Sequence, residues 1–387
     1  MAPKIAIVGG GPSGLSLAAL LEKHGINYII YERGAQNELP RGGCLDLHVG
    51  SGQRVIKEAD LFDDFKKNSR DGDATIHLLY NHHGQLVTSW GEGRDAPEID
   101  RWQLRNVLLK PIPEHKIIWS KSVKSSARDD NGQIVLSFTD GTTASGFDLI
   151  VGADGTFSKI RHLVTPAQPA FAGQIFLTSR ISPSNPFYDT MQSLARVGSM
   201  VAMGAGKHMF NSMQGDGHYR IDIGILNTED FATSDLVDLT NMDAVKKFLL
   251  QDDYFGSYAP QLQDIIKYSE GPFRPWLMYY MPPDQLNWSA TPGVTLIGDA
   301  AHVTTPFVGD GVNCAMRDAV ILADKLKEFG VTTKAVMEYE KEMFPYAIDV
   351  IQRSIASGNM FFEDDAPRAF SQAMSSASPI IGKTDDY

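Results

Sequence analysis

The sequence has 387 residues, of which 43% are hydrophobic and 21% are charged, a composition typical of a soluble globular protein. Its 35 basic and 47 acidic residues give a formal net charge of −12, which disfavours binding to nucleic acid or to an anionic membrane surface. The two cysteines, Cys44 and Cys314, are too few for a disulfide framework. We therefore expect a cytoplasmic protein with no nucleic-acid or membrane partner.

The chain begins with a pattern of strand, turn, helix and strand. Residues 5–21 are uncharged and resemble a signal-peptide core, but glycines and a proline in the middle would break an inserting helix. We instead predict a strand at 4–8, a helix at 13–24 that ends at Gly25, and a second strand at 26–32.

The next segments predict a hairpin and a capped helix. Strand-like runs at 75–80 and 86–90 flank a turn. Asp100 precedes Gln103 by three residues, which predicts a capping box at the start of a helix through Leu109.

The middle of the chain changes character. Further strands are predicted at 133–139, 148–151, 174–181, 199–203, 219–226 and 294–299, and helices at 244–250 and 312–362. Because the pattern of the first part returns only at 294, we expect a dinucleotide fold that is split by an inserted sheet domain.

Three glycines with a fixed spacing carry the first chemical signal. Gly9, Gly11 and Gly14 lie between the first strand and the helix, and Glu32 ends the next strand. They permit a tight turn, close approach of a pyrophosphate and close helix–strand packing, while the helix N-terminus offers free N–H groups. Glu32 would accept hydrogen bonds from the hydroxyls of an unphosphorylated adenosine ribose. The motif predicts a dinucleotide, either NAD or FAD.

Two later segments favour FAD. Residues 148–161, which contain Asp154 and Gly155, resemble the DG motif of the class A flavin monooxygenases, and residues 298–313 resemble their GD motif. The three fingerprints occur in the order of that family, and the resemblance covers residues 1 to about 350. It implies an α/β fold: a Rossmann-like FAD-binding domain of the p-hydroxybenzoate-hydroxylase type, an inserted β-sheet substrate domain and a C-terminal bridging helix.

We expect four parts along the chain. The FAD-binding domain comprises 1–172 and 281–330, the substrate-binding sheet domain comprises 173–280, and the C-terminal helix and tail comprise 331–387.

The third motif also has a direct physical interpretation. Asp299 follows a strand and precedes small residues, which suits a carboxylate that meets a ribityl chain. Pro306 has no N–H to donate, so its surroundings can stack beside a planar ring. Gly309 and Gly311 begin a helix whose positive N-terminus would stabilise the negative charge of reduced flavin.

In the family, the residue matching Asp299 contacts the ribityl chain, and the loop matching residues 306–313 lies against the isoalloxazine. We therefore add Val312 and Asn313 to the expected cofactor-binding residues. Many relatives carry Gln between the two glycines, where this chain has Asp310.

Residues 42–53 and 97–105 are similar to the tetracycline destructases, the tetracycline-inactivating members of the family. In that subgroup the residues matching Asp46 and Arg101 contact FAD. Arg105 lies on the same helix face as Arg101, and two guanidiniums suit a pyrophosphate or ribityl oxygen. The nicotinamide phosphates would meet two further basic residues, Arg33 and Arg41.

The substrate residues are less similar. A Gln and a His that contact the drug in those enzymes align near Thr178 and Asp222, and neither matches. Phe361 and Phe362 retain the aromatic character of a substrate lid. We therefore expect a flat oxygenated substrate, with slow turnover of tetracycline.

By this resemblance NADPH or NADH reduces FAD transiently, O₂ adds at flavin C4a to give a hydroperoxide, and a phenol, enol or polyketide ring is hydroxylated. The flavin carries the chemistry, so we assign no catalytic side chain and no metal. We expect a monomer whose partners are O₂ and a small aromatic or polyketide molecule.

The same fold is compatible with three other functions. A flavin-dependent halogenase needs a Trp-x-Trp signature, and the five tryptophans never occur two apart. A flavin dehydrogenase or reductase acting on prenyl or sterol substrates stays open. A non-enzymatic prenyl-protein chaperone would show degraded phosphate motifs, whereas the three motifs here are intact.

Overall fold

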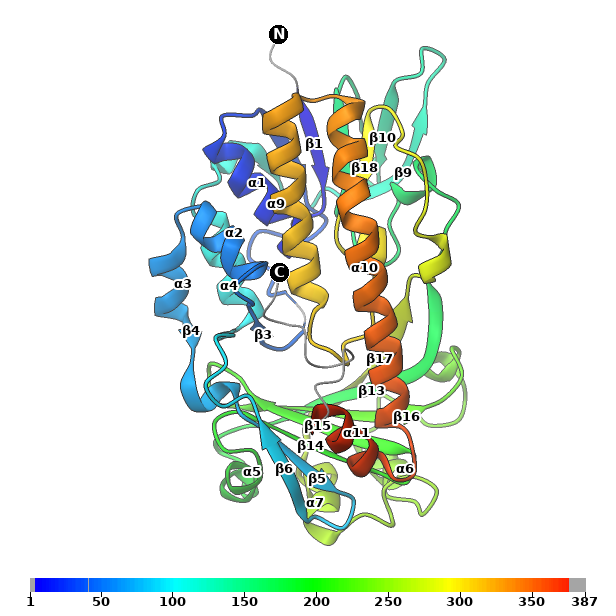
Figure 1. Ribbon diagram of the computed structural model, residues 1–387. Helices are drawn as coiled ribbons and strands as arrows, with labels where there is room; N and C mark the ends of the chain where they lie inside the picture. The colour runs from blue at the N-terminus through cyan, green and yellow to red at the C-terminus, as the bar shows by residue number, and fades with distance from the viewer. Residues whose placement is uncertain (1–3, 41, 376–387) are drawn as a thin grey trace.

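The computed structural model describes residues 4–40 and 42–375 of the chain. They form two main sheets, one above the other in Figure 1, with a long helix beside both. Arg41, expected at the nicotinamide phosphates, lies outside the described residues.

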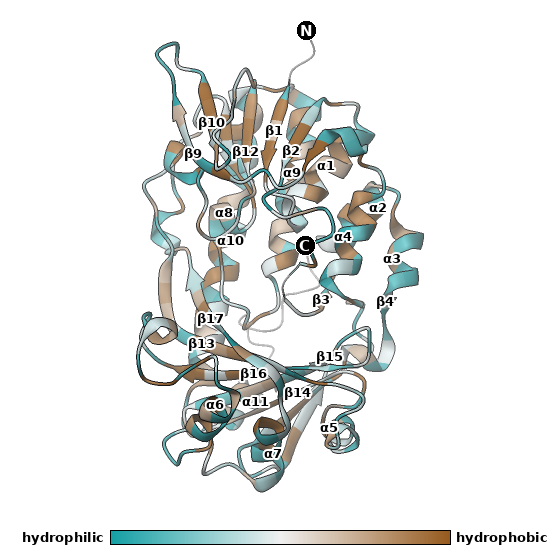
Figure 2. Ribbon diagram, turned by 180° about the vertical axis from the view of Figure 1, so that it is seen from behind, coloured by the Kyte–Doolittle hydropathy of each residue, from teal (hydrophilic) through white to brown (hydrophobic). Residues whose placement is uncertain are grey.

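The upper sheet is parallel, with strand order β18-β12-β1-β2-β8. These strands are β1 (Ile5–Val8), β2 (Tyr28–Tyr31), β8 (Ile117–Ile118), β12 (Leu149–Gly152) and β18 (Val294–Leu296). Their residues are largely hydrophobic, as the brown ribbons of Figure 2 show. Their side chains are largely buried, because other elements cover both faces of the sheet. The helices α1 (Pro12–Lys23) and α9 (Gly311–Phe329) pack side by side against it. The predicted Rossmann-like part is confirmed.

The lower sheet has seven strands in the order β17-β13-β16-β15-β14-β5-β6. They are β5 (His77–Asn81), β6 (Leu86–Trp90), β13 (Ala170–Ile181), β14 (Ser199–Gly204), β15 (Lys207–Met213), β16 (Tyr219–Leu226) and β17 (Glu270–Tyr280). One face packs against α5 (Tyr188–Ala195), α6 (Met242–Leu249) and α7 (Pro260–Tyr268). The other face packs partly against α11 (Ala366–Ser375) and is otherwise open to the space between the sheets. The predicted separate sheet domain is confirmed.

The hairpin of β5 and β6 belongs to this lower sheet, although we expected it in the first part of the chain. β5 pairs in parallel with β14, so that Leu79 lies opposite Val201. The two strands are more than a hundred residues apart, and a local pattern cannot reveal such a pairing. The predicted boundary at residue 172 therefore misplaces residues 77–90, and the other boundaries stay predictions.

The predicted helical run at 312–362 is two helices. α9 ends at Phe329, because the next residue, Gly330, has a φ of +70° that does not continue a helix. α10 (Thr333–Phe361) then runs along α9 and reaches the lower sheet, as the orange helix of Figure 1 shows. Its C-terminal end brings Phe361 against the apolar open face of that sheet.

The remaining elements are short. They are β3 (Leu45–Asp46), β4 (Ser69–Arg70), β7 (Glu98–Ile99), β9 (Val123–Arg128), β10 (Ile134–Phe138), β11 (Thr143–Ala144), α2 (Gly52–Glu58), α3 (Phe62–Asn68), α4 (Arg101–Leu109) and α8 (Asp299–His302). The helix predicted to end at Leu109 is confirmed, but its capping box is wrong. The Asp100 carboxylate caps no helix N–H and accepts instead from Arg70 of β4 and from Gly215, between β15 and β16, which ties it to the lower sheet.

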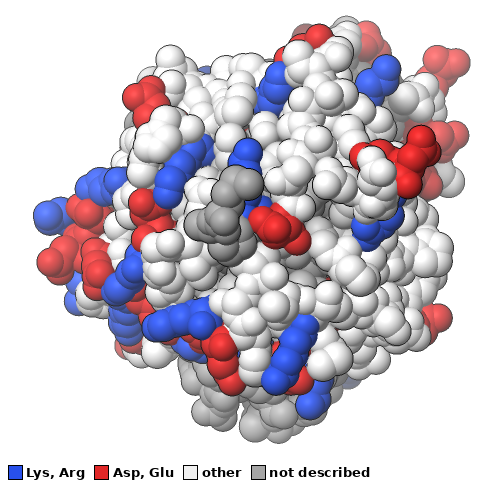
Figure 3. Space-filling view, turned by 90° about the horizontal axis from the view of Figure 1, so that it is seen from above, with Lys and Arg blue, Asp and Glu red and all other residues white. Residues whose placement is uncertain are grey.

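The surface carries both signs of charge. On the face drawn in Figure 3, basic and acidic side chains are interspersed rather than gathered by sign. Among residues 4–40 and 42–375, none of the helices combines the length and the apolar character that crossing a bilayer requires.

Candidate active site

A cavity of about 1600 Å³ lies between the carboxyl ends of the parallel strands and the open face of the lower sheet. It exceeds the roughly 300–1,000 Å³ of a pocket for one small ligand, so it has room for two molecules. The predicted residues that line it are Gly9, Gly11, Glu32, Arg33, Asp46, Arg101, Arg105, Asp154, Gly155, Asp222, Asp299, Pro306, Gly309, Gly311, Val312 and Phe361. Four others, Gly14, Thr178, Asn313 and Phe362, do not line it.

The glycines at the start of α1 have separate roles. A Cβ on Gly9 would lie 2.2 Å from the carbonyl oxygen of Ala153, and one on Gly14 would lie 2.1 Å from that of Gly9. Both positions therefore exclude a side chain because the backbones pack too closely. A Cβ on Gly11 would have none of the described atoms outside the neighbouring residues within 4 Å, and Gly11 faces the cavity. A phosphate can approach the helix N-terminus there.

Glu32 is held by the glycine loop. Its carboxylate accepts hydrogen bonds from the backbone N–H groups of Gly10 and Gly34, the latter at 2.6 Å. Since a carboxylate has about four acceptor positions, these bonds leave capacity for ribose hydroxyls. The predicted position of an acid at the end of β2 is thus matched by a fixed, cavity-lining carboxylate.

Arg161 joins the second and third motifs. Its guanidinium donates to the backbone carbonyls of Thr156 (2.8 Å), Asp299 (3.1 Å) and Ala300 (2.8 Å), and the residue is 2% exposed. Asp154 accepts from the Ser158 hydroxyl and the Lys159 N–H, so it closes the turn after β12. From the sequence, Arg161 is only the last residue of the DG-like segment 148–161, and no role was predicted for it.

Asp299 opens α8 and exposes its side chain to the cavity. The surrounding protein raises the pKa of its carboxyl by desolvation, which His302, Arg101 and Arg161 oppose. Behind it, Asp318 accepts from His302 Nε2 (2.6 Å) and from the Gly298 N–H (2.7 Å). This buried pair fixes the turn from β18 into α8 and so fixes the direction of Asp299.

Two arginines of α4 behave differently. The Nε of Arg101 is buried without a hydrogen-bond partner, and burial lowers the pKa of its guanidinium. A cation in that state requires an anionic or carbonyl ligand. Arg105 already donates to the carbonyls of Glu38 (2.9 Å) and Gln36 (3.1 Å), so it holds the loop at the cavity edge.

Asn313 acts as a clamp behind the cavity wall. Its amide donates to the Asp46 carbonyl (2.9 Å) and accepts from the His48 N–H (2.9 Å), the Ser51 hydroxyl and the Gly52 N–H. The residue is fully buried. It therefore positions the segment after β3 against α9, while Pro306, Gly309, Gly311 and Val312 form the wall itself.

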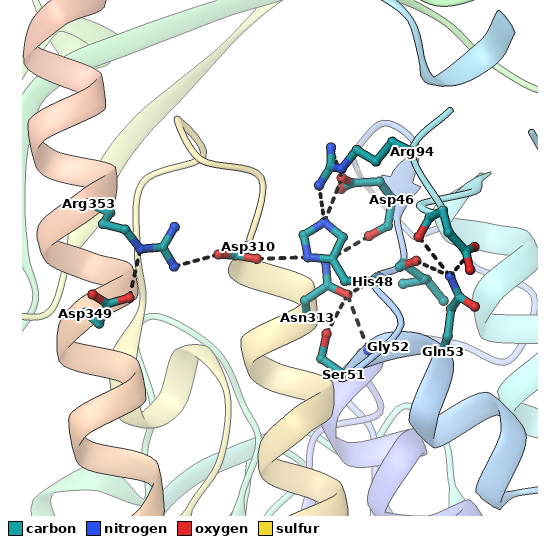
Figure 4. A network of polar contacts seen from close by, with 12 residues as sticks. Asp46, His48, Ser51, Gly52, Gln53, Arg94, Asp310, Asn313, Asp349 and Arg353 are labelled. Carbon is teal, nitrogen blue, oxygen red and sulfur yellow. Dashed lines mark hydrogen bonds and ion pairs between the residues drawn. The ribbon is translucent and has the colours of Figure 1, made fainter. Parts of the chain in front are cut away.

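Beside this clamp lies a network of charged side chains (Figure 4). Asp310 contacts His48 Nδ1 (3.1 Å) and Arg353 Nη2 (2.8 Å), and His48 Nε2 contacts Asp46 (3.0 Å). The departure from Gln at position 310 thus gives a carboxylate with two buried cationic partners. Sequence reasoning missed His48 and Arg353, and also Arg94, which contacts Asp46 at 3.3 Å. His48 belongs to the quoted segment 42–53, but Arg94 and Arg353 lie outside every motif.

The lower end of the cavity is mainly apolar. Its lining includes Trp90, Phe176, Val201, Phe210, Trp276, Met278, Phe307, Phe361 and Phe370. Phe362 packs behind them against His208 (4.8 Å between ring centroids). Because these residues come from strands far apart in sequence, only Phe361 and Phe362 were predicted.

The two aligned sheet residues are bound to each other. Thr178 donates to Asp222, and Arg220 binds both oxygens of Asp222 at 2.7 and 2.9 Å. Asp222 is therefore no free carboxylate: it aims Arg220, which lines the cavity. The imidazole of His77 also lines this end, hydrogen-bonded to Ser199 and stacked on Trp90 (5.0 Å).

The upper end fits FAD. The open position at Gly11 can admit a pyrophosphate, and the buried Nε of Arg101 can donate to an anion or carbonyl. Asp299 faces the cavity, and within residues 4–40 and 42–375 no group donates a hydrogen bond to its carboxylate. All three residues line the same cavity, as the binding of one dinucleotide requires.

Comparison with known proteins agrees with this geometry. The FAD binding domain family matches residues 3–219 and 288–354. The chain is 28% identical over 383 residues to monooxygenase penA of Penicillium thymicola, covering 87% of this chain and 88% of that protein. It is 27% identical to the 3-amino-4-hydroxybenzoate 2-monooxygenase PtnB3 of Streptomyces platensis, covering all of this chain and 94% of that protein.

Solved structures share the fold. The chain is similar to Klebsiella pneumoniae HpxO complexed with FAD and uric acid, with a TM-score of 0.78 and 21% identity, covering 97% of this chain and 93% of that one. The tetracycline destructase Tet(51) has a TM-score of 0.72 and 18% identity, covering 99% and 96% of the two chains. The likeness to tetracycline destructases thus extends to the fold, while the similar sequences named above are other monooxygenases.

Proposed function

Since this chain belongs to the FAD binding domain family, we propose that it is an NAD(P)H- and FAD-dependent monooxygenase that hydroxylates a flat, oxygenated ring compound. One observation carries the proposal. A single cavity runs from the glycines at the start of α1 to the aromatic residues of the lower sheet, so a cofactor and a substrate would meet inside it. Named monooxygenases among its relatives support the same chemistry.

Bound FAD would supply the oxygen-activating chemistry, with NADPH or NADH as reductant. The chain's own residues bind and orient. The N-terminus of α1 and Arg101 would hold the dinucleotide, and Asp299 its ribityl hydroxyls. The loop from Pro306 to Gly311 would lie beside the ring system, with the positive end of α9 directed at it.

The lower end of the cavity supports a flat substrate. Aromatic and apolar side chains recognise shape, and Arg220 supplies a fixed cation for a phenolate, enolate or carboxylate oxygen. The drug-contacting Gln and His of the tetracycline enzymes are replaced by a Thr178–Asp222 pair that is already satisfied. We therefore propose phenolic or polyketide substrates, with slow turnover of tetracycline.

The test is a panel of phenolic, enolic and polyketide compounds, including tetracycline. Substrate-stimulated oxidation of NADPH and NADH is measured together with product mass. We expect at least one flat oxygenated compound to stimulate oxidation and to gain one oxygen atom. No stimulation by any member, or oxidation that yields a desaturated product, would favour the dehydrogenase alternative. Rapid tetracycline hydroxylation would show that the Thr178–Asp222 pair matters less than proposed.

FAD itself is tested first. The purified protein should be yellow or become yellow on reconstitution, and a protein that binds no FAD would contradict the proposal and favour a non-enzymatic role. We propose that the enzyme acts as a cytoplasmic monomer. Light scattering of the holoprotein tests whether it is a monomer.

A further inference from the structure

Six charged side chains form a continuous series of contacts from the cavity to helix α10 (Figure 4). From the cavity outward they are Asp46 with Arg94, then His48, Asp310, Arg353 and Asp349. His48 and Asp310 are each only 2% exposed. Their charges are therefore balanced by one another and by their neighbours rather than by water.

His48 has two alternative partners for one nitrogen. Nδ1 lies 3.1 Å from Asp310 Oδ1, whereas Nε2 lies 3.0 Å from Asp46 Oδ2 and 2.7 Å from Arg94 Nη2. A carboxylate can only accept a hydrogen bond and a guanidinium can only donate one. Nε2 therefore donates to Asp46 when the imidazole carries both protons, and accepts from Arg94 when only Nδ1 is protonated.

Both carboxylates that contact His48 belong to the cavity wall. Asp46 lines the cavity, and its Oδ1 is 3.7 Å from the place that a Cβ on Gly309 would take. Asp310 lies between the wall residues Gly309 and Gly311. Asn313 holds the His48 backbone at 2.9 Å. Because the backbone of His48 is fixed, a change in the charge of its imidazole acts on Asp46 and Asp310, and through them on the cavity wall.

We propose that His48 is a positioning residue for the flavin ring. Its positive charge draws Asp46 and the 306–311 loop together behind the ring site. When His48 loses its proton, Nε2 accepts a hydrogen bond from Arg94 instead of donating one to Asp46. The inference rests on the proposed function, because a flavin in this cavity gains negative charge on reduction by NAD(P)H. An imidazolium behind the wall would offset that charge.

The groups around His48 set the pH at which this change occurs. Burial disfavours the imidazolium, but hydrogen bonds to Asp310 and Asp46 outweigh burial and raise the pKa of His48 to about 9. Arg94, in the loop before β7, opposes the positive charge, and Arg353 of α10 neutralises part of Asp310.

Three further groups lie nearby. His77 of β5 and Glu98 of β7 both interact electrostatically with Asp46, and Asp349 of α10 pairs with Arg353. His77 is held neutral near pH 7, because burial lowers its pKa to about 4. The imidazolium of His48 is therefore present at neutral pH and is lost as the pH rises through about 9.

The experiment uses the full chain reconstituted with FAD. His48→Gln keeps a polar side chain that cannot be charged, and His115→Gln, at an exposed histidine in the turn before β8, is the matched control. FAD affinity is measured by flavin fluorescence, and the midpoint potential of bound FAD is measured from about pH 6 to about pH 10.

We expect a break near pH 9 in the plot of midpoint potential against pH for the wild type and for His115→Gln. In His48→Gln the break should disappear, and bound FAD should be harder to reduce at neutral pH, with FAD affinity weakened by about tenfold or less. A break that persists unchanged in His48→Gln would overturn the proposal, because a merely structural role would leave it in place. A wild type that binds no FAD would instead contradict the proposed function.

Asp310→Asn is the second variant, for use if His48→Gln does not fold. It removes one of the two carboxylates that favour the imidazolium while keeping the shape of the side chain. The break should therefore move to lower pH by about one unit or more. A break at the wild-type pH in Asp310→Asn would also overturn the proposal.

Discussion

The guanidinium of Arg161 donates a hydrogen bond to the backbone carbonyl of Asp299 at 3.1 Å and so ties two motifs that are 138 residues apart. The first follows β12 and the second follows β18, two neighbouring parallel strands. A buried cation with three backbone acceptors thus sets the spacing of the cavity wall.

Replacing Arg161 by Ala should remove this tie. Three backbone carbonyls would lose their donor, which should cost about 2–4 kcal/mol of unfolding free energy and most of the bound FAD. Arg128→Ala is the matched control, because the exposed Arg128 also donates to two carbonyls, of Gly132 and Pro292. Denaturant unfolding should show that Arg128→Ala loses at most about 1 kcal/mol of unfolding free energy. Equal losses in both variants would contradict the role given to Arg161.

Gly11→Ala and Gly14→Ala should separate cofactor binding from stability. A Cβ at Gly14 would meet the Gly9 oxygen at 2.1 Å, so the helix must shift and the protein should be destabilised. A Cβ at Gly11 meets no protein atom and its φ of −77° suits alanine, so the fold should keep its stability. That methyl group would occupy the phosphate approach, and FAD affinity should fall at least tenfold. Thermal unfolding without FAD and flavin titration are the two measurements. Full FAD affinity in Gly11→Ala would show that the dinucleotide lies elsewhere.

Asp299→Ala should weaken FAD retention while the protein stays folded. A ribityl hydroxyl would lose a charge-assisted partner, for which about 1.5–3 kcal/mol, or roughly 10- to 150-fold in affinity, is expected. Asp299→Asn keeps a hydrogen-bond acceptor without the charge, so its FAD affinity should lie between those of the wild type and Asp299→Ala. The flavin-to-protein ratio after purification and the dissociation constant check this. Unchanged yellow occupancy in Asp299→Ala would count against the placement of the third motif.

Glu340→Gln should stabilise the protein at alkaline pH. Glu340 of α10 is 2% exposed, and burial raises its pKa to about 7, although Thr295 donates to one of its oxygens. The pKa of Glu340 in the folded state lies above the unfolded value of 4.5. The contribution of its protonated carboxyl to the free energy of unfolding is therefore fully present below about pH 4.5 and is lost as the pH rises through 7.

The variant cannot ionise and its amide oxygen still accepts from Thr295. Relative to the wild type it should therefore gain on the order of 3 kcal/mol above pH 8 and little at pH 5. Urea unfolding at the two pH values measures the difference, and an equal effect at both would show that ionisation of Glu340 is not the cause. Glu338→Gln, at a partly exposed acid on the same helix, is the control.

The upper part of the molecule was predictable because its signals are local. A tight turn, a helix N-terminus and an acid at a strand end lie within one stretch of chain, and the structure places Gly11 and Glu32 where the spacing indicates. The same holds for Asp299 and for the glycines before α9. Each needs only its neighbours in sequence to have a fixed position.

The lower part was not predictable in the same way. The apolar end of the cavity combines strands from residue 77 to residue 280, and which faces meet depends on pairings such as β5 with β14. Asp222 became an anchor for Arg220 rather than a free group because the two lie two residues apart on one strand face. His48 contacts Asp310, at the start of α9, and Asp310 in turn contacts Arg353 of α10; both lie far along the chain, and only the folded arrangement reveals these contacts.

The order of strands in the parallel sheet has a consequence for biosynthesis. β1 pairs with β12, and β12 pairs with β18, which ends at residue 296. During translation, the parallel sheet that contains the N-terminal strand therefore cannot be completed until about three quarters of the chain has been made. The seven-stranded sheet, complete at Tyr280, can form earlier. Flavin binding accordingly requires β18 and the wall residues that follow it, so nascent chains truncated before β18 should emerge without cofactor even where the first motif is intact.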